Sequence, residues 1–244
     1  MRTSPLIVAG AVLALPATVI AGKRVTAGDQ SLQIAALVKP AKAGKGVNLG
    51  FQVDYESRTR GARIKENTKR ITIVLPKGMA LHPDRRPACR LSVIWNEGST
   101  RCDPDSIVGA GTGTIDARPD VPSAVDAEIR VFNGIHDAGF DGTPPDPTTP
   151  ALIIEVRSPL VTTDMAFDIH GRRLQADFPQ PGGAFPDQVF HIQKVELGIP
   201  LEKGKQPYVT APKTCTGSWP FAMTIANFDG PSITARHAVT CKRG

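Results

Sequence analysis

Acidic side chains at alternate positions are the residues of this sequence best suited to acid–base chemistry. Asp126 and Glu128 lie two residues apart in the segment VDAEI, so both would point to the same side of a β-strand. Two carboxyl groups that face one cleft can hydrolyse a glycosidic bond. The apolar residues between and beside them, Val125, Ala127 and Ile129, favour a simpler interpretation: a strand with one exposed and one buried face. We therefore predict no catalytic residue and keep a glycan-active hydrolase as an alternative.

Basic side chains are concentrated in residues 57–70, between two apolar segments, with Glu66 as the only acid. They are Arg58, Arg60, Arg63, Lys65, Lys69 and Arg70. Positive charge at this density can hold an anionic cell-envelope polymer. Nucleic-acid binding is not expected, because the segment has no aromatic side chain on which bases could stack. A solvated loop that raises solubility is the simpler interpretation, and we favour it.

The glycine-rich segment GAGTG at residues 109–113 resembles a phosphate-binding loop only in composition. A P-loop ends in Gly-Lys-Ser/Thr and leads into a helix, whereas β-forming residues follow here. We interpret the segment as a strand whose glycines allow another backbone to approach closely. No nucleotide cofactor is expected.

Metal binding and acyl transfer also lack a sequence signature. The histidines fall in separate segments, none in H-x-H or H-E-x-x-H spacing: His82, His136, His170, His191 and His237. Residues 135–150 contain Asp137, Asp141 and Asp146 without the calcium-loop pattern D-x-D-x-D-G, so we favour a solvated connection and keep calcium binding as an alternative. No Gly-x-Ser-x-Gly sequence marks a nucleophilic serine. We expect neither a metal nor another cofactor.

Residues 1–21 have the layout of a secretory signal peptide. Arg2 precedes an apolar stretch at residues 6–20, and Val19-Ile20-Ala21 offers small or aliphatic residues before a cut. A glycine, a proline and a threonine interrupt the stretch, which also falls short of the roughly 20 apolar residues of a membrane span. The sequence therefore predicts an exported protein, secreted or in the cell envelope, with no membrane span after cleavage.

Export makes disulfides the expected state of the four cysteines, because an oxidising compartment favours them over metal-binding or catalytic thiols. Pairing each cysteine with its neighbour in the sequence closes the shortest loops. A zinc site is the alternative, but the chain has no C-x-x-C pair. We predict one bridge between Cys89 and Cys102 and a second between Cys215 and Cys241.

Short β-strands would carry these residues. The 22 prolines and 23 glycines divide the 244 residues into short segments, and turn-forming dipeptides separate runs of β-forming residues. The runs cover residues 32–38, 47–55, 71–75, 107–115, 125–132, 152–156, 161–169, 174–178 and 189–199. One helical turn is expected within residues 87–96. The sequence predicts a single all-β domain at residues 31–244, an antiparallel β-sandwich with jelly-roll topology as one form, after a flexible lead-in at residues 22–30.

The C-terminal hairpin can be predicted in its register. Asp229-Gly230 is a hairpin turn signal between two β-forming runs. If Ile225 opposes Ile233, the pairs that follow place almost only apolar side chains on one face. Cys215 and Cys241 then share that face near the open end of the hairpin, which is an independent reason to pair them.

Short motifs rich in Pro, Gly and Cys are distributed along the chain. They are LPKGM at 75–79, Cys89 followed by Leu91-Ser92, CDPDS at 102–106 running into VGAGT at 108–112, VFNG at 131–134, and APKTC at 211–215 with WPF at 219–221. Their order resembles that of a group of exported, uncharacterised actinobacterial proteins, over residues 30–244. The resemblance implies export and a disulfide-bearing β fold, and it brings no reaction and no catalytic residue.

The formal net charge of +6 is segregated along the chain, with basic residues in excess at 22–101 and 193–244 and acidic residues in excess at 102–192. A sugar-binding surface would need exposed aromatic faces, whereas Trp95 and Trp219 are expected in the core. We therefore predict an exported, non-catalytic envelope or extracellular protein with a structural or binding role. Its expected partner is an anionic cell-envelope polymer or a glycan. A glycan-active hydrolase and a carbohydrate-binding module on the same β-sandwich are the alternatives.

Overall fold

The structure is a computed structural model that describes residues 22–57, 68–116, 124–138, 148–159, 162–178, 191–228 and 230–243. The signal peptide predicted at residues 1–21 lies outside these ranges. Strands dominate the described residues, and the helical elements are short. The strands are β1 (Val25–Ala27), β2 (Gln30–Lys39), β3 (Asn48–Ser57), β4 (Thr68–Val74), β5 (Ala80–Leu81), β6 (Cys89–Arg90), β7 (Ile107–Asp116), β8 (Val125–Ile135), β9 (Pro150–Arg157), β10 (Thr162–His170), β11 (Arg173–Asp177), β12 (His191–Ile199), β13 (Val209–Thr210), β14 (Ser218–Asn227) and β15 (Ile233–Thr240). The helical elements are α1 (Leu91–Glu97) and the 3-10 turns η1 (Pro83–Arg85), η2 (Ser99–Arg101) and η3 (Pro104–Ser106).

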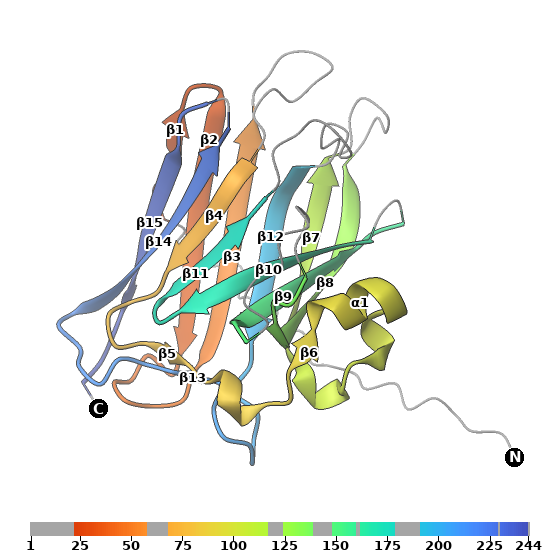
Figure 1. Ribbon diagram of the computed structural model, residues 1–244. Coiled ribbons are helices and arrows are strands. Elements are labelled where there is room, and N and C mark those ends of the chain that lie inside the picture. The colour runs from red at the N-terminus through yellow and green to blue at the C-terminus, as the bar shows by residue number, and fades with distance from the viewer. Residues whose placement is uncertain are drawn as a thin grey trace, which may run out of the picture.

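Most strands form one continuous antiparallel sheet in the order β1-β2-β3-β12-β7-β8-β9-β10-β11-β4-β14-β15. The sheet curls nearly into a barrel, so that β14 and β15 return to the side of β1 and β2 (Figure 1). Near this junction the backbone N–H of Ala36 donates a hydrogen bond to His237 Nδ1 at 2.9 Å. The all-β, antiparallel prediction is confirmed, and both packed layers belong to a single curled sheet.

The interior of the curled sheet holds the main apolar core. Phe51 and Phe221 come from opposite sides of the curl and meet edge to face, with their ring centroids 5.5 Å apart. The glycines of β7 allow the backbone of β12 to approach the backbone of β7 closely: a Cβ atom on Gly109 would come within 2.5 Å of the carbonyl oxygen of Gly198. The interpretation of residues 109–113 as a strand with close backbone approach is confirmed.

A second, smaller core lies on the outer face of β8, β9 and β10. Leu91 and Ile94 of α1 pack there on Phe132 and Ile153, and a disulfide between Cys89 and Cys102 closes the loop that contains the helix. Figure 1 shows this helical segment beside β8 and β9. The predicted helical turn is therefore present, and it covers part of a sheet face that would otherwise be exposed.

The C-terminal hairpin has the predicted register, with Ile225 opposite Ile233 and Trp219 opposite Val239. The Cys241 N–H donates to the carbonyl of Gly217, at the open end of the hairpin. Cys215 and Cys241 form a disulfide with their Cα atoms 5.9 Å apart. Both predicted bridges are confirmed, and no free cysteine is left among the four.

The chain enters the sheet early. Within residues 22–30, predicted as a lead-in, β1 pairs with β2 in antiparallel register. Arg24 contacts the acidic side chains of β3, with its Nη2 atom 2.8 Å from Asp54 Oδ2 and its Nη1 atom 3.3 Å from Glu56 Oε2. Residues 22–30 therefore belong to the folded domain.

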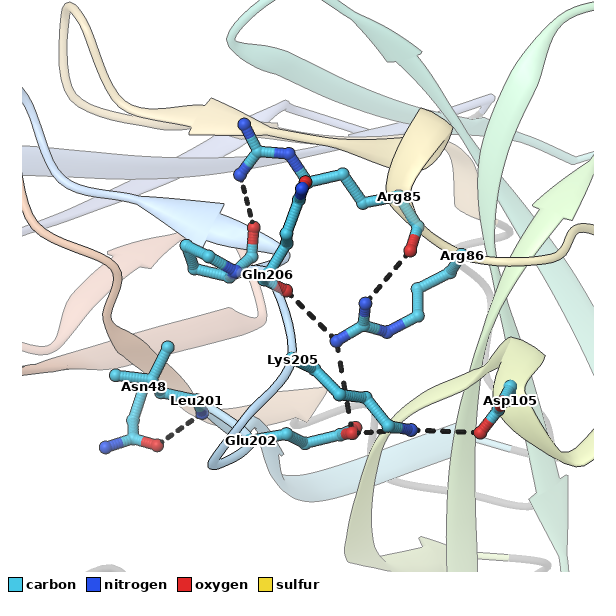
Figure 2. Close-up of polar contacts among 9 residues, drawn as sticks. Asn48, Arg85, Arg86, Asp105, Leu201, Glu202, Lys205 and Gln206 are labelled. Atoms are coloured by element: carbon cyan, nitrogen blue, oxygen red, sulfur yellow. Dashed lines mark hydrogen bonds and ion pairs between the residues drawn. The ribbon is translucent and has the colours of Figure 1, made fainter.

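One end of the curled sheet is closed by two loops that share a polar network. Figure 2 shows Arg86 donating hydrogen bonds to the carbonyl oxygens of Arg85 and Gln206, and Lys205 bridging Glu202 and Asp105. The Lys205 Nζ atom lies 2.8 Å from Glu202 Oε2 and 2.9 Å from Asp105 Oδ1. These contacts join the loop after β12 to η1 and η3.

Asn133 anchors the same closure from inside the sheet. The side chain is fully buried, and Nδ2 lies 3.0 Å from each of the carbonyl oxygens of Pro83, Arg86 and Pro87. Its Oδ1 atom accepts a hydrogen bond from the Tyr208 hydroxyl at 2.9 Å. Burial raises the pKa of Tyr208, which keeps this hydroxyl protonated as the donor.

Candidate functional site

An open groove of about 710 Å³ crosses the outward face of β12, β7 and β8. Its position follows from strand alternation: Ala127 and Ile129 are buried on the inner side of β8, so Asp126 and Glu128 point outward. The same alternation applies to β7 and β12. The polar residues that line the groove are Thr112, Thr114, Asp126, Glu128, Arg157, Ser158, Lys194 and Glu196.

Strand register arranges these side chains in cross-strand rows. One row runs from Glu196 through Thr112 and Glu128 to Arg157. The next row along the strands places Lys194, Thr114 and Asp126 side by side. Neighbouring strands lie about 4.8 Å apart and alternate residues about 6.7 Å apart. The groove therefore presents hydroxyl and charged groups on a regular grid of a few ångströms.

The cations of the groove are already paired with protein carboxylates. Lys194 Nζ lies 3.1 Å from Glu196 Oε1 on the same strand. Arg157 donates from Nη2 to Glu155 Oε1 at 2.8 Å and to Ser99 Oγ at 2.7 Å.

Two of the acidic side chains in the groove, unlike its cations, have no ion-pair partner among the described residues. Within the described ranges, neither Asp126 nor Glu128 forms an ion pair, and both are exposed. The two carboxylates of β8 are thus the groups in the groove that are most available to accept hydrogen bonds from a ligand.

A pair of acidic side chains, one buried and one half-buried, lies beside the groove. Glu155 is only 1% exposed, and Asp164 faces it from the next strand in register. Desolvation, reinforced by the charge of Glu155, raises the pKa of Asp164 to about 6. Arg157 links Glu155 to the groove, because its Nη2 atom donates to the Glu155 carboxylate and its side chain lines the groove.

The basic cluster predicted at residues 57–70 is described only at its end. Arg58, Arg60, Arg63 and Lys65 lie outside the described residues. At the start of β4, Arg70 forms an ion pair with Asp177, and Lys69 Nζ lies 5.8 Å from the ring centroid of Phe228. Anionic-polymer binding by this cluster stays a prediction.

The histidine side chains that the structure describes lie apart from one another. His136 Nδ1 lies 2.7 Å from Asp168 Oδ1, and that hydrogen bond raises the pKa of His136. His82 Nε2 lies 3.0 Å from Thr210 Oγ1, whereas His170 lies at the end of β10. No group of three or more His, Cys, Asp or Glu side chains suited to a metal ion occurs in the part of the chain that the structure describes.

The one described aspartate of the acidic loop has a structural partner in α1. In residues 135–150, Asp137 accepts hydrogen bonds from the N–H and hydroxyl of Ser92, whereas Asp141 and Asp146 lie outside the described ranges.

Trp219 is 3% exposed in the main core, and Trp95 packs against the second core. The prediction that both tryptophans serve the core is confirmed.

Most groove residues were not recognised from the sequence. The alternation of Asp126 and Glu128 within one strand was detectable, and so was a lone Glu155 in the apolar run LIIEV. Lys194, Glu196 and Arg157 carry no local signal, because their relevance depends on which strands become neighbours.

The fold and the groove define a disulfide-bonded, antiparallel β protein with an open polar groove on one sheet face. Comparison with family models, with curated proteins and with solved structures finds no match. Within the described residues, no helix is long and apolar enough to cross a membrane.

Proposed function

We propose that this chain is an exported, non-catalytic protein that binds a neutral, hydroxyl-rich glycan in the groove over β12, β7 and β8. The observation that carries the proposal is the pairing pattern in the groove. Lys194 and Arg157 are neutralised by protein carboxylates, whereas Asp126 and Glu128 remain as exposed acceptors. Sugar hydroxyls are donors that such carboxylates bind well.

The charge of the groove distinguishes between the two expected kinds of partner. With both cations paired, the exposed charge on its floor is negative and would repel an anionic polymer. Thr112 and Thr114 add hydroxyls that can donate or accept, as a ligand with many hydroxyls requires. Anionic-polymer binding, if it occurs, is therefore assigned to the basic segment at residues 57–70 and not to the groove.

Export is part of the proposal. Two disulfides in one domain are typical of proteins that fold in an oxidising compartment. The signal-like layout of residues 1–21 supports the same location. The exported protein would encounter glycans of the envelope or of the surroundings.

A glycan-active hydrolase is the second candidate, because two glutamates lie in one cross-strand row of the groove. Glu196 and Glu128 flank Thr112 in one cross-strand row, so their strands are about 9.6 Å apart, close to the carboxyl separation of inverting glycosidases. Glu196 is already engaged by Lys194, with Nζ 3.1 Å from Oε1, and Glu128 is exposed, so neither carboxyl group sits in the apolar pocket that keeps a general acid protonated. The geometry therefore favours binding over hydrolysis.

Affinity electrophoresis of the mature protein tests the proposal. Gels containing neutral polysaccharides, such as a glucan, a mannan or a galactan, are compared with gels containing polygalacturonate. Retardation by at least one neutral polymer, with no release of reducing ends, is expected. Retardation by polygalacturonate alone would contradict glycan binding in the groove, and release of reducing ends that is lost in Glu128→Gln would establish the hydrolase instead.

A further inference from the structure

The curled sheet has a seam where its first and last long strands meet. β15 lies beside β2 without being its partner in the sheet order, and the seam is bridged by the hydrogen bond from Ala36 N–H to His237 Nδ1. The residues that precede β1 enter this seam. Gly22 donates its N–H to the carbonyl of Ile34 at 2.9 Å, and its own carbonyl accepts from Gln33 Nε2 at 2.8 Å.

Only glycine fits at this position. A Cβ atom on Gly22 would lie 2.5 Å from the carbonyl oxygen of Arg236 on β15 and 2.9 Å from that of Ile34 on β2. Both obstacles are backbone atoms of sheet strands, so they cannot move aside as a flexible side chain would. Gly22 is therefore held between two carbonyl oxygens, one from each side of the seam.

Arg24 fixes the direction in which the chain leaves the seam. Its guanidinium donates to Ser31 Oγ at 2.9 Å and to Asp54 Oδ2 at 2.8 Å. Ser31 is fully buried, so this contact is built into β2 and is not a chance surface contact. Gly22 and Arg24 together attach the segment to both β2 and β3.

We propose that the seam is a receiving site for the α-amino group of Gly22, formed when the bond between Ala21 and Gly22 is hydrolysed during export. The inference rests on the proposed export, because the cut lies at the end of the predicted signal peptide. Cleavage breaks the bond between the Ala21 carbonyl carbon and the Gly22 nitrogen. The water oxygen becomes part of the Ala21 carboxylate, and Gly22 acquires an ammonium group.

The ammonium group suits the seam better than the amide that it replaces. An amide nitrogen has one proton, which is given to Ile34, whereas an ammonium group has three protons and carries a positive charge. The Arg236 carbonyl oxygen, which would lie 2.5 Å from a Cβ atom on Gly22, is a second backbone acceptor beside this residue. Because charge-assisted hydrogen bonds are the stronger ones, processing would tighten the seam between β2 and β15.

The test combines the mass of the exported protein with the stability of matched variants. Expression of the full chain in a secreting host should yield an exported protein whose intact mass matches residues 22–244, so that its first residue is Gly22. The purified mature protein is then compared with Gly22→Ala, with a form that retains Ala21, and with Lys23→Ala as the control at an exposed neighbouring position. We expect Gly22→Ala to lower Tm by about 5 °C or more, Ala21 retention to lower it by about 2 °C, and Lys23→Ala to leave it within about 1 °C.

The close fit of Gly22, the role of the ammonium group and the position of the cut are tested by separate measurements. A Gly22→Ala protein as stable as Lys23→Ala would refute the close fit in the seam. Equal Tm values with and without Ala21 would refute the role of the ammonium group, and a mature protein that begins elsewhere would refute the cut. A protein that stays inside the host would contradict both the proposed export and the cut. Absence of retardation by every neutral polysaccharide would contradict the proposed glycan binding alone and would not affect the Tm comparison.

Discussion

Asn133 is the buried residue whose replacement should disturb the structure most for the smallest change in volume. Asn133→Leu keeps a similar shape but removes the amide that binds the loop at Pro83, Arg86 and Pro87 and the Tyr208 hydroxyl. The amide has two protons, so two partly buried carbonyl acceptors lose a donor and the buried Tyr208 hydroxyl loses its acceptor. At about 1–1.5 kcal/mol for each group that loses its partner, the expected loss is about 3–4 kcal/mol.

A double-mutant cycle with Tyr208→Phe identifies how much of this loss belongs to the one hydrogen bond between the two side chains. Tyr208→Phe alone leaves Asn133 Oδ1 without its donor and should cost about 1.5 kcal/mol. The double variant should cost about 1 kcal/mol less than the sum of the single variants, because the shared bond is lost only once.

Urea unfolding followed by tryptophan fluorescence measures the free energies. Asn96→Leu is the matched control, since Asn96 is exposed on α1 and should change the free energy of unfolding by less than about 0.5 kcal/mol. The reasoning is refuted if Asn133→Leu costs no more than Asn96→Leu, or if the two single variants are additive.

Two further predictions concern the disulfides and the buried acids. Replacing Cys215 and Cys241 by Ser opens a loop with a sequence separation of 26 and should lower the free energy of unfolding by about 3.5 kcal/mol. Replacing Cys89 and Cys102 by Ser, with a separation of 13, should lower it by about 3 kcal/mol. Urea unfolding measures both values, and losses below about 1 kcal/mol would contradict them. For Asp164, the native pKa of about 6 exceeds the ordinary value of 3.8, so the native state binds the proton more tightly, and stability falls as the pH rises from about 4 to about 6. Asp164→Asn should therefore be more stable than the wild type at pH 8 and similar to it at pH 4, and a difference that does not grow with pH would contradict this assignment.

The sequence predicted the local features of the fold well. Turn chemistry at Asp229-Gly230 and the alternation of apolar residues predicted the hairpin in its register, because a slip of one residue would expose the face that carries Ile225 and Ile233. The same local reasoning placed both disulfides. It also predicted the close approach at residues 109–113, because a strand rich in glycine leaves space that only another backbone can fill.

The order of the strands was not predictable in this way. β12 lies between β3 and β7, although long segments of chain separate it from both. Alternation determines which face a residue joins but not which strand becomes its neighbour, and the entropy of loop closure changes only slowly with loop length. Asp126 and Glu128 could therefore be recognised as a pair, whereas their placement with Lys194 and Glu196 in one groove could not.

The binding role of the groove is tested most directly by titrating the mature protein with the neutral polysaccharide that retards it best. The double variant Asp126→Asn/Glu128→Gln keeps the size of both side chains and removes their charges, and Asp29→Asn, in the exposed turn between β1 and β2, is the matched control. At about 1.5 kcal/mol or more for a hydrogen bond to a charged group, calorimetry should show at least about a tenfold loss of affinity in the double variant. The control should bind as the wild type does. Equal affinity of the double variant and the control would show that the glycan is not bound by these carboxylates.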